Sequence, residues 1–219
     1  MNHCKHVAAV AILFLTTSVA AFGQMNMRQT QLPRGIFHPV VGNGAVYEMT
    51  DTSMPKRIVE FDIVGKDTVN GKDAYWVEFN FPDTGMGDII AKTQAILDGG
   101  TTYTARTIMQ MGNRPPMEMP ASMGAKPQPQ PIEIKDKADD LGSELVTTPA
   151  GTFTCEHYRM KDGTGDAWVS ASVSPFGLVK SQSKDSTMVL VKTLTGVTDK
   201  ITGTPVPFNP MMMMQRPPQ

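Results

Sequence analysis

The chain has 219 residues, with 20 Lys and Arg against 21 Asp and Glu, and a formal net charge of −1 at pH 7. This balance excludes a polycationic surface of the kind that binds nucleic acid, and it also excludes a strongly acidic, cation-collecting chain. Seventeen methionines make thioether sulfur the unusual side-chain chemistry of the protein.

Residues 1–23 have the three parts of a cleavable signal peptide. Lys5 follows the amino terminus, an apolar run extends over residues 7–15, and small residues close the segment. A membrane-spanning helix needs about 20 apolar residues, so a retained anchor is the weaker alternative. We expect cleavage between Ala20 and Gln24 and a periplasmic or secreted protein, with no transmembrane segment in the mature chain.

The cysteines indicate how the exported chain is stabilised. Cys4 precedes the apolar run, where it cannot serve as a lipoprotein cysteine, and it leaves with the signal peptide. The mature chain then keeps Cys155 alone and cannot form an internal disulfide. Its stability must come from packing.

Apolar residues recur at every second position from Gly44 onward, which is the spacing of β-strands with one buried face. Residues 57–81 form the most secure prediction, a β-hairpin. Its centre is Asn70-Gly71, which accepts the positive φ angles of a type I′ turn. The alternate face, which carries the acidic side chains, is expected to meet water.

The rest of the mature chain predicts a meander of antiparallel strands. Further strands are expected at 88–97, 101–111, 152–160, 165–170, 177–183 and 187–195. Helical segments are few: residues 135–141 are expected to make a turn or two, and residues 51–54 one turn. The predicted fold is mainly β, a curved antiparallel sheet or half-open β-barrel.

Proline-rich segments set the domain organisation. Residues 113–133 contain six prolines and five residues of the pattern PQPQP, so they are expected to form an exposed, extended Pro/Met-rich loop. Residues 204–219 combine prolines with four consecutive methionines and are expected to be a disordered tail. A single antiparallel β domain is expected over residues 37–203.

Motifs for catalysis are missing from the sequence. After removal of the signal only His38 and His157 remain, and no nucleophile–base pattern, phosphate-binding glycine loop or paired-cysteine motif accompanies them. The sequence therefore predicts a protein that is not an enzyme and needs no cofactor. Cys155 and His157 share one face of a predicted strand, but two ligands do not make a metal site, and a core position for Cys155 is the stronger interpretation.

The methionines offer an alternative function. Thioether sulfur binds Cu(I) without deprotonation, and an exported protein can meet copper. The residues assigned to this alternative are Met109, Met111, Met117, Met119 and Met123. Flexible methionines also form adaptable apolar surfaces, so both interpretations stay open.

The second half of the chain carries a recognisable pattern. Its parts are TPAGTFTC at 148–155, HYR at 157–159, AWV at 167–169 and SPFGLVK at 174–180. This pattern resembles uncharacterised secreted bacterial proteins that are similar in architecture to the LolA/LolB-like lipoprotein carriers, over about residues 144–195. The resemblance implies a curved, half-closed antiparallel sheet that can shelter an acyl chain, although one fold hosts many functions.

We therefore expect a non-catalytic exported binding module that holds an apolar, lipid-like ligand or docks an envelope protein. A Cu(I)-binding protein and a structural envelope protein without a small ligand are the alternatives. The residues predicted to line an apolar site, which would serve equally well as an ordinary core, are Phe61, Ile63, Tyr75, Val77, Phe79, Phe153 and Trp168.

Overall fold

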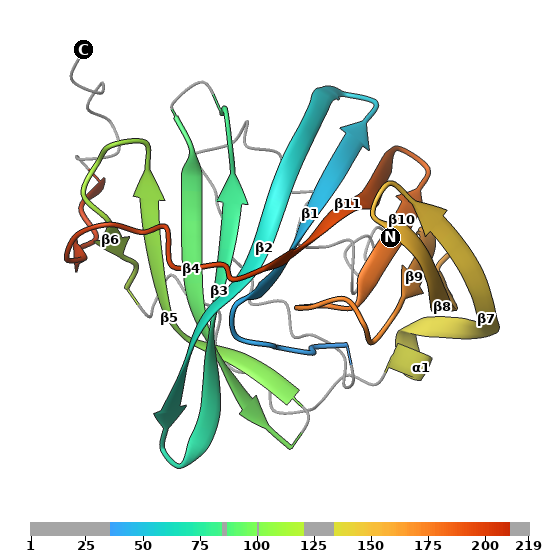
Figure 1. Cartoon of the computed structure of the whole chain (residues 1–219), viewed down its shortest axis with the longest axis horizontal. Helices are drawn as coiled ribbons and strands as arrows, with labels where there is room; N and C mark the ends of the chain where they lie inside the picture. The colour runs from blue at the N-terminus through green and yellow to red at the C-terminus, as the bar shows by residue number, and fades with distance from the viewer. Residues whose placement is uncertain (1–35, 85–86, 100, 121–133, 211–219) are drawn as a thin grey trace, which may run out of the picture.

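The computed structural model describes residues 36–84, 87–99, 101–120 and 134–210. Within these ranges twelve strands form one open sheet in the order β12-β6-β5-β4-β3-β2-β1-β11-β10-β9-β8-β7 (Figure 1). Every neighbouring pair is antiparallel except β12 and β6. The prediction of a mainly β chain with a curved, unclosed sheet is confirmed. The predicted signal peptide lies outside the described residues.

The strands are mostly long and joined by short turns. Their bounds are β1 Asn43–Asp51, β2 Met54–Val69, β3 Lys72–Phe81, β4 Ile89–Asp98, β5 Thr101–Met111, β6 Met117–Glu118, β7 Ala138–Thr148, β8 Gly151–Met160, β9 Gly165–Val169, β10 Leu178–Ser183, β11 Ser186–Thr195 and β12 Val206–Pro207. In the described segments Pro210 and the four-residue α1, Ile134–Lys137, are helical, and no helix there is long and apolar enough to cross a membrane.

The predicted hairpin is present as β2 and β3. Asn70 and Gly71 connect the two strands with φ angles of 50° and 75°, which a type I′ turn requires. The pairing places Phe61 opposite Phe79 and Ile63 opposite Val77. One face of the hairpin is therefore apolar, and we call it the core face.

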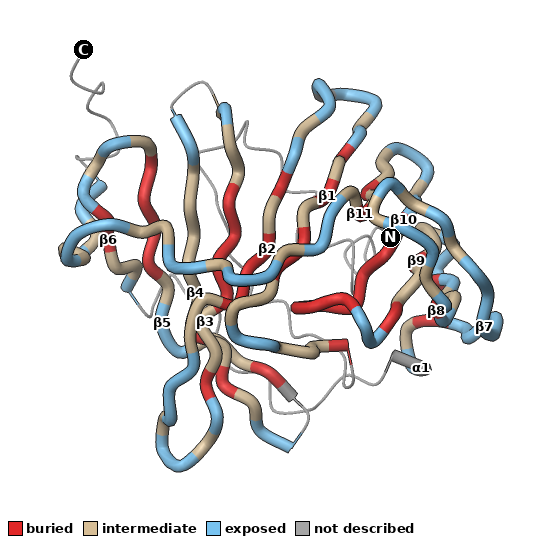
Figure 2. The backbone as a smooth tube through the Cα atoms, in the orientation of Figure 1, coloured by how far each residue is buried: buried red, intermediate tan, exposed pale blue. Residues whose placement is uncertain are grey.

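The core face is filled by side chains from both halves of the chain. Phe176, from the segment before β10, lies 5.7 Å from Phe61 and 6.2 Å from Phe79 between ring centroids. Tyr47 on β1 is fully buried, and its hydroxyl donates a 2.8 Å hydrogen bond to the carbonyl of Leu178. Buried residues run through the middle of the central strands in Figure 2. The second half of the chain thus covers the core face of the first.

The six further strands predicted from the sequence are all present, but β7 differs from the prediction. Residues 135–141 were expected to be helical, whereas the helix ends at Lys137 and β7 begins at Ala138. A bulge between Asp140 and Ser143 interrupts the alternation of β7, with Gly142 at a φ of 91°. The expected helical turn at 51–54 is a hairpin turn, in which Asp51 Oδ1 accepts a 2.8 Å hydrogen bond from the Ser53 amide.

Residues 196–205, which we call the strap, leave β11 and cross β2, β3, β4 and β5 on the face opposite the core (Figure 1). At its end Val206 of β12 pairs with Met117 of β6. Two expectations are corrected by this pairing: Met117 is buried within the predicted exposed loop, and part of the predicted disordered tail belongs to the sheet. Residues 121–133 and 211–219 lie outside the described residues.

Candidate functional site

Three carboxylates lie beneath the strap. Glu60 and Asp62 alternate with the apolar residues of β2, and Asp62 is the cross-strand partner of Glu78 on β3. The sequence predicted that this face meets water, but Asp62 and Glu78 are each 0% exposed because the strap covers them. The prediction is wrong at this point, and the covered face, which we call the strap face, carries a buried acidic cluster.

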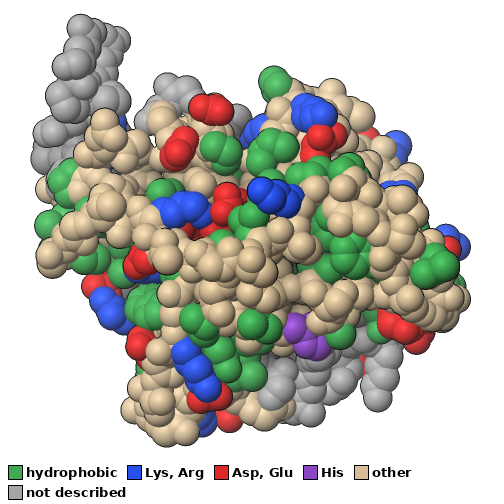
Figure 3. Space-filling view, viewed as in Figure 1, with side chains coloured by type: hydrophobic (Ala, Val, Ile, Leu, Met, Phe, Trp, Pro, Cys, Tyr) green, Lys and Arg blue, Asp and Glu red, His purple; other side chains and the backbone are tan. Residues whose placement is uncertain are grey.

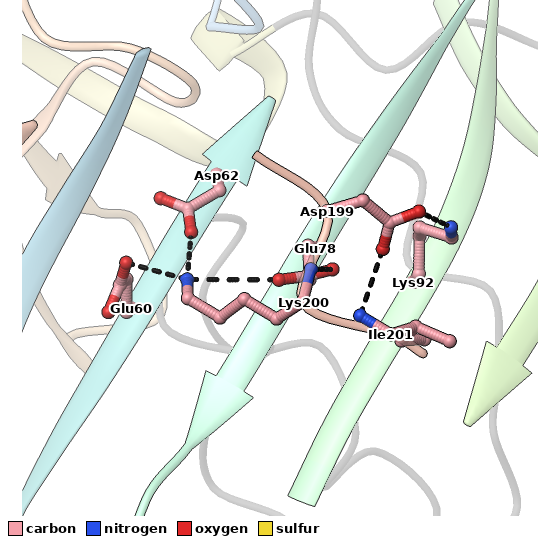
Figure 4. Close-up of polar contacts among 7 residues, drawn as sticks. All are labelled: Glu60, Asp62, Glu78, Lys92, Asp199, Lys200 and Ile201. Carbon is pink, nitrogen blue, oxygen red and sulfur yellow. Dashed lines mark hydrogen bonds and ion pairs between the residues drawn. The ribbon is translucent and has the colours of Figure 1, made fainter. Parts of the chain in front are cut away.

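One ammonium serves all three carboxylates (Figure 4). Lys200 Nζ, from the strap, lies 2.5 Å from Asp62 Oδ2, 2.8 Å from Glu60 Oε1 and 3.7 Å from Glu78 Oε1. The Lys200 amide also donates a 3.1 Å hydrogen bond to Glu78 Oε2. When all three acids are ionised, two negative charges of this group lack a counter-charge from Lys200.

The rest of the strap is fastened to the next two strands. Asp199 forms an ion pair with Lys92 on β4 and accepts a 3.0 Å hydrogen bond from the Ile201 amide. The Thr202 amide donates a 3.0 Å hydrogen bond to Gln110 Oε1 on β5. Figure 3 shows acidic and basic side chains in a row where the strap crosses this face. Polar contacts therefore attach the strap to β4 and β5 as well as to β2 and β3.

Some oxygens in the cluster have no hydrogen-bond donor. Among the described side chains these buried acceptors are Asp62 Oδ1, Glu78 Oε1 and Asn80 Oδ1. Asp62 Oδ1 sits so close to the backbone of β1 that a Cβ at Gly44 would lie 1.9 Å from it, so only glycine fits there. A buried acceptor without a donor costs about 1–3 kcal/mol, and the cluster is therefore under-satisfied when fully ionised.

Burial changes the acid–base properties of the cluster. It raises the pKa of Asp62 to about 6, against the opposing hydrogen bond from Lys200. It also raises the pKa of Glu78 to about 7, against the opposing hydrogen bond from the Lys200 amide. For Lys200 burial acts to lower the pKa, but hydrogen bonds to Asp62 and Glu60 outweigh it and the pKa rises. The cluster can therefore exchange protons near neutral pH.

The residues predicted to line an apolar site all belong to the main core or pack against it. Phe61, Ile63, Val77 and Phe79 are buried members of that core. The remaining three, Tyr75, Phe153 and Trp168, are partly buried against the same core. Phe61 and Phe79 lie 5.3 Å apart between ring centroids, so they contact each other. Their role toward a ligand stays a prediction.

Four of the five methionines of the copper alternative come together. Met109, Met111 and Met117 form a small buried cluster, and Met119 packs against it. Met109 and Met117 are direct cross-strand partners on β5 and β6. Met123 lies outside the described residues. The cluster forms a second, smaller apolar core at the end of the sheet, and copper binding stays a prediction.

Cys155 and His157 share one strand, β8, but they do not act as a pair. Cys155 is buried in the main core, where burial and the neighbouring Glu144 and Glu156 raise the pKa of its thiol to about 11. His157 stacks on Trp168 at 4.4 Å, and its two ring nitrogens lie 3.0 Å from Glu144 Oε1 and 2.8 Å from an Asp166 oxygen.

A metal site built from these residue types is also not evident elsewhere. Over residues 36–84, 87–99, 101–120 and 134–210, no group of three or more His, Cys, Asp or Glu side chains is arranged to hold a metal ion.

The strand β7 forms one end of the sheet and was not predicted. Residues 139–145 are all exposed, and β8 is its only neighbour in the strand order of the described sheet. Leu145 is 72% exposed and Leu141 48% exposed. Acidic side chains, Asp139, Asp140 and Glu144, lie along the same strand. An open strand edge with exposed leucines is a surface that another extended chain can pair with.

Comparisons with known proteins give distant likenesses of fold. No family model matches the chain, and no curated protein matches its sequence. A solved structure of a predicted lipoprotein from Parabacteroides distasonis is 14% identical and has a TM-score of 0.42, covering 74% of this chain and 99% of that one. A predicted exported protein with a YmcC-like fold from Bacteroides fragilis is 16% identical and has a TM-score of 0.40, covering 72% of this chain and 98% of that one.

A third solved structure, the MucA/MucB complex of Pseudomonas aeruginosa, is 8% identical and has a TM-score of 0.35, covering 72% of this chain and 52% of the matched chain. These likenesses assign neither a family nor a function to the chain. The resemblance to LolA/LolB-like lipoprotein carriers stays a prediction.

Proposed function

We propose that this protein is an exported, non-catalytic module that docks an envelope protein along the open edge of its sheet. The observation that carries the proposal is β7, a terminal strand of eleven residues whose outer part is exposed and carries Leu141 and Leu145. Isolated exposed leucines are ordinary, but two on a strand whose outer edge has no partner strand among the described residues mark a place for a partner.

The occupant that best suits this edge is an extended, basic segment of another protein. Backbone groups of β7 supply the hydrogen bonds of an added strand, and Leu145 supplies an apolar contact. Glu144 already contacts His157 and Trp168, whereas the acidic side chains of Asp139 and Asp140 favour Lys or Arg in the added segment. They disfavour a second copy of this chain, which would bring the same acidic set to the interface.

Docking is preferred to carriage of an apolar ligand because the predicted lining residues are in contact with one another. Phe176 packs against both Phe61 and Phe79, which leaves the rings filling the space between the two halves of the sheet. Catalysis is disfavoured because the two carboxyls whose pKa values are raised toward neutrality, Asp62 and Glu78, lie beneath the strap and away from solvent.

Export, on which the proposal also depends, is inferred from the signal-peptide pattern of residues 1–23.

The proposal is tested by photocrosslinking in the native host. A photoreactive residue at position 145 is expected to give one discrete adduct with an envelope protein, while the same residue at Lys184, exposed in the turn before β11, gives none. A synthetic peptide covering the crosslinked segment should then bind the purified protein directly. An adduct of the chain with itself, or equal adducts at both positions, would contradict the proposal.

Substitution of Leu145 separates docking from folding. Leu145→Lys is expected to weaken binding of that peptide at least about tenfold. The free energy of unfolding should stay within about 0.5 kcal/mol of the wild-type value, because the side chain is exposed. Ile58→Lys is the matched control, since Ile58 is another exposed large hydrophobic residue and lies on β2. Equal loss of binding in both variants would show that β7 has no special role.

A further inference from the structure

We propose that the carboxylate cluster is a proton-operated latch, which fastens the strap to β2 and β3 when it takes up a proton and loosens the strap when it loses one. The latch is distinct from the β7 edge, because β2 and β3 lie in the middle of the sheet order and β7 lies at one end. Its elements are the side chains that meet between the strap and the sheet.

The first step is the charge count of the cluster. The charged groups that meet here are Glu60 and Asp62 from β2, Glu78 from β3, Lys92 from β4, and Asp199 and Lys200 from the strap. Fully ionised, these six groups sum to −2, because four carboxylates face two ammonium groups. Uptake of two protons makes the cluster neutral. Burial of a neutral cluster costs less free energy than burial of a cluster with a net charge of −2.

The second step is what a proton does locally. Asp62 Oδ1 and Glu78 Oε1 are buried acceptors without a donor. A protonated Asp62 is placed to donate to Glu60, and a protonated Glu78 is placed to donate to Asp199. The bond from Glu78 to Asp199 joins the sheet to the strap directly. Proton uptake therefore removes a buried negative charge that lacks a full set of donors, and it adds a hydrogen bond between the sheet and the strap.

The direction of the pH effect follows from the two states. With the strap in place the pKa of Asp62 is about 6 and that of Glu78 about 7, both raised by burial. With the strap lifted, water reaches both groups and their pKa values return toward about 4. The closed state holds more protons, so the gain in strap attachment is fully present below pH 4 and is lost as pH rises through 6 to 7.

The strap also holds β12 against β6, because Val206 pairs with Met117. A loosened strap releases this short strand from the end of the sheet. The latch therefore controls whether the edge at β6, opposite β7 in the strand order, is covered.

Hydrogen exchange on the full mature chain tests the latch. The amides of Lys200 and Thr202, which bond to Glu78 and Gln110, report on the strap. After correction for the intrinsic pH dependence of exchange, their protection factors are expected to fall at least about tenfold between pH 5.5 and pH 8. Amides shared between β8 and β9 should keep theirs. Equal behaviour of strap and reference amides would overturn the proposal.

A variant in which position 78 cannot titrate gives the sharper test. Glu78→Gln keeps an oxygen to accept from the Lys200 amide, and it is expected to reduce the pH dependence of strap protection to the about fourfold change that Asp62 alone supplies. Glu48→Gln, which removes a surface partner of Lys56, should keep the wild-type profile. An unchanged pH dependence in Glu78→Gln would refute the latch.

If Glu78→Gln fails to fold, an NMR titration of the Asp62 and Glu78 carboxyl carbons in the wild-type protein still tests the latch. Midpoints between pH 5.5 and 7.5 for Asp62 and Glu78 in a carbon NMR titration support the latch, and midpoints near 4 for both overturn it.

Discussion

Removing the ammonium of Lys200 should destabilise the protein in a pH-dependent way. Lys200→Met removes the ammonium that lies 2.5 Å from Asp62 and 3.7 Å from Glu78, two carboxyls without solvent exposure. Breaking a buried ion pair from one side costs about 3–5 kcal/mol, and we expect the lower end, about 3 kcal/mol, because Lys200 itself is partly exposed. That value applies at pH 8, where both carboxyls are ionised.

At pH 5 the same substitution should cost about 1 kcal/mol, because both carboxyls titrate above this pH and protonated groups need no counter-ion. Urea unfolding at the two pH values measures both numbers. Lys72→Met is the matched control, since the Lys72–Asp98 pair is exposed to water and should contribute little to stability. A loss for Lys200→Met that is no greater than the control, or that is greater at pH 5 than at pH 8, would refute the reasoning.

Three further predictions concern other parts of the sheet. Gly44→Ala places a methyl group 1.9 Å from a buried carboxylate oxygen and should lower the free energy of unfolding by about 3 kcal/mol, whereas Gly65→Ala, with its nearest contact at 3.4 Å, should cost about 1 kcal/mol or less in the same urea titration. Cys155 should react with a thiol reagent at pH 8 only at the rate of unfolding, since its side chain has no solvent exposure and burial also raises the pKa of the thiol; rapid labelling of the folded protein would contradict this. The copper alternative predicts Cu(I) uptake in a chelator competition that is lost when the four clustered methionines become leucine, and uptake that survives these changes would exclude the cluster as its site.

The sequence was sufficient for the parts of the fold that are decided locally. The hairpin at 57–81 was predictable because Asn70-Gly71 fixes the turn and alternation fixes the register on either side. The same alternation correctly separated Phe61 from Asp62. Alternation shows which residues share a face of the sheet. A packed core and the wall of a ligand site both require an apolar face, so alternation does not distinguish between them.

The candidate site was not predictable, because its cover comes from far along the chain. Asp62 and Lys200 are 138 residues apart, and nothing near Asp62 indicates that the strap will bury it. An acidic residue between apolar ones on a strand is typical of a solvated face, and that interpretation was wrong here.

The edge strand β7 escaped prediction for a local reason. The bulge between Asp140 and Ser143 breaks the two-residue period over residues 138–145. Without that two-residue alternation of apolar and polar residues, the sequence does not indicate a strand. The leucines that make the edge a docking candidate stood in a stretch with no readable alternation.

The position of the strap late in the polypeptide has a consequence for biogenesis. Residues 54–81 can form their hairpin as soon as they emerge, but the buried acids of that hairpin receive their ammonium only after about 120 further residues have followed. A chain cut short before residue 196 would present Asp62 and Glu78 to water and leave β6 without its short parallel neighbour. Completion of the fold is thus tied to completion of the chain, and truncated products would differ from the finished protein in both charge and protease sensitivity on that one surface.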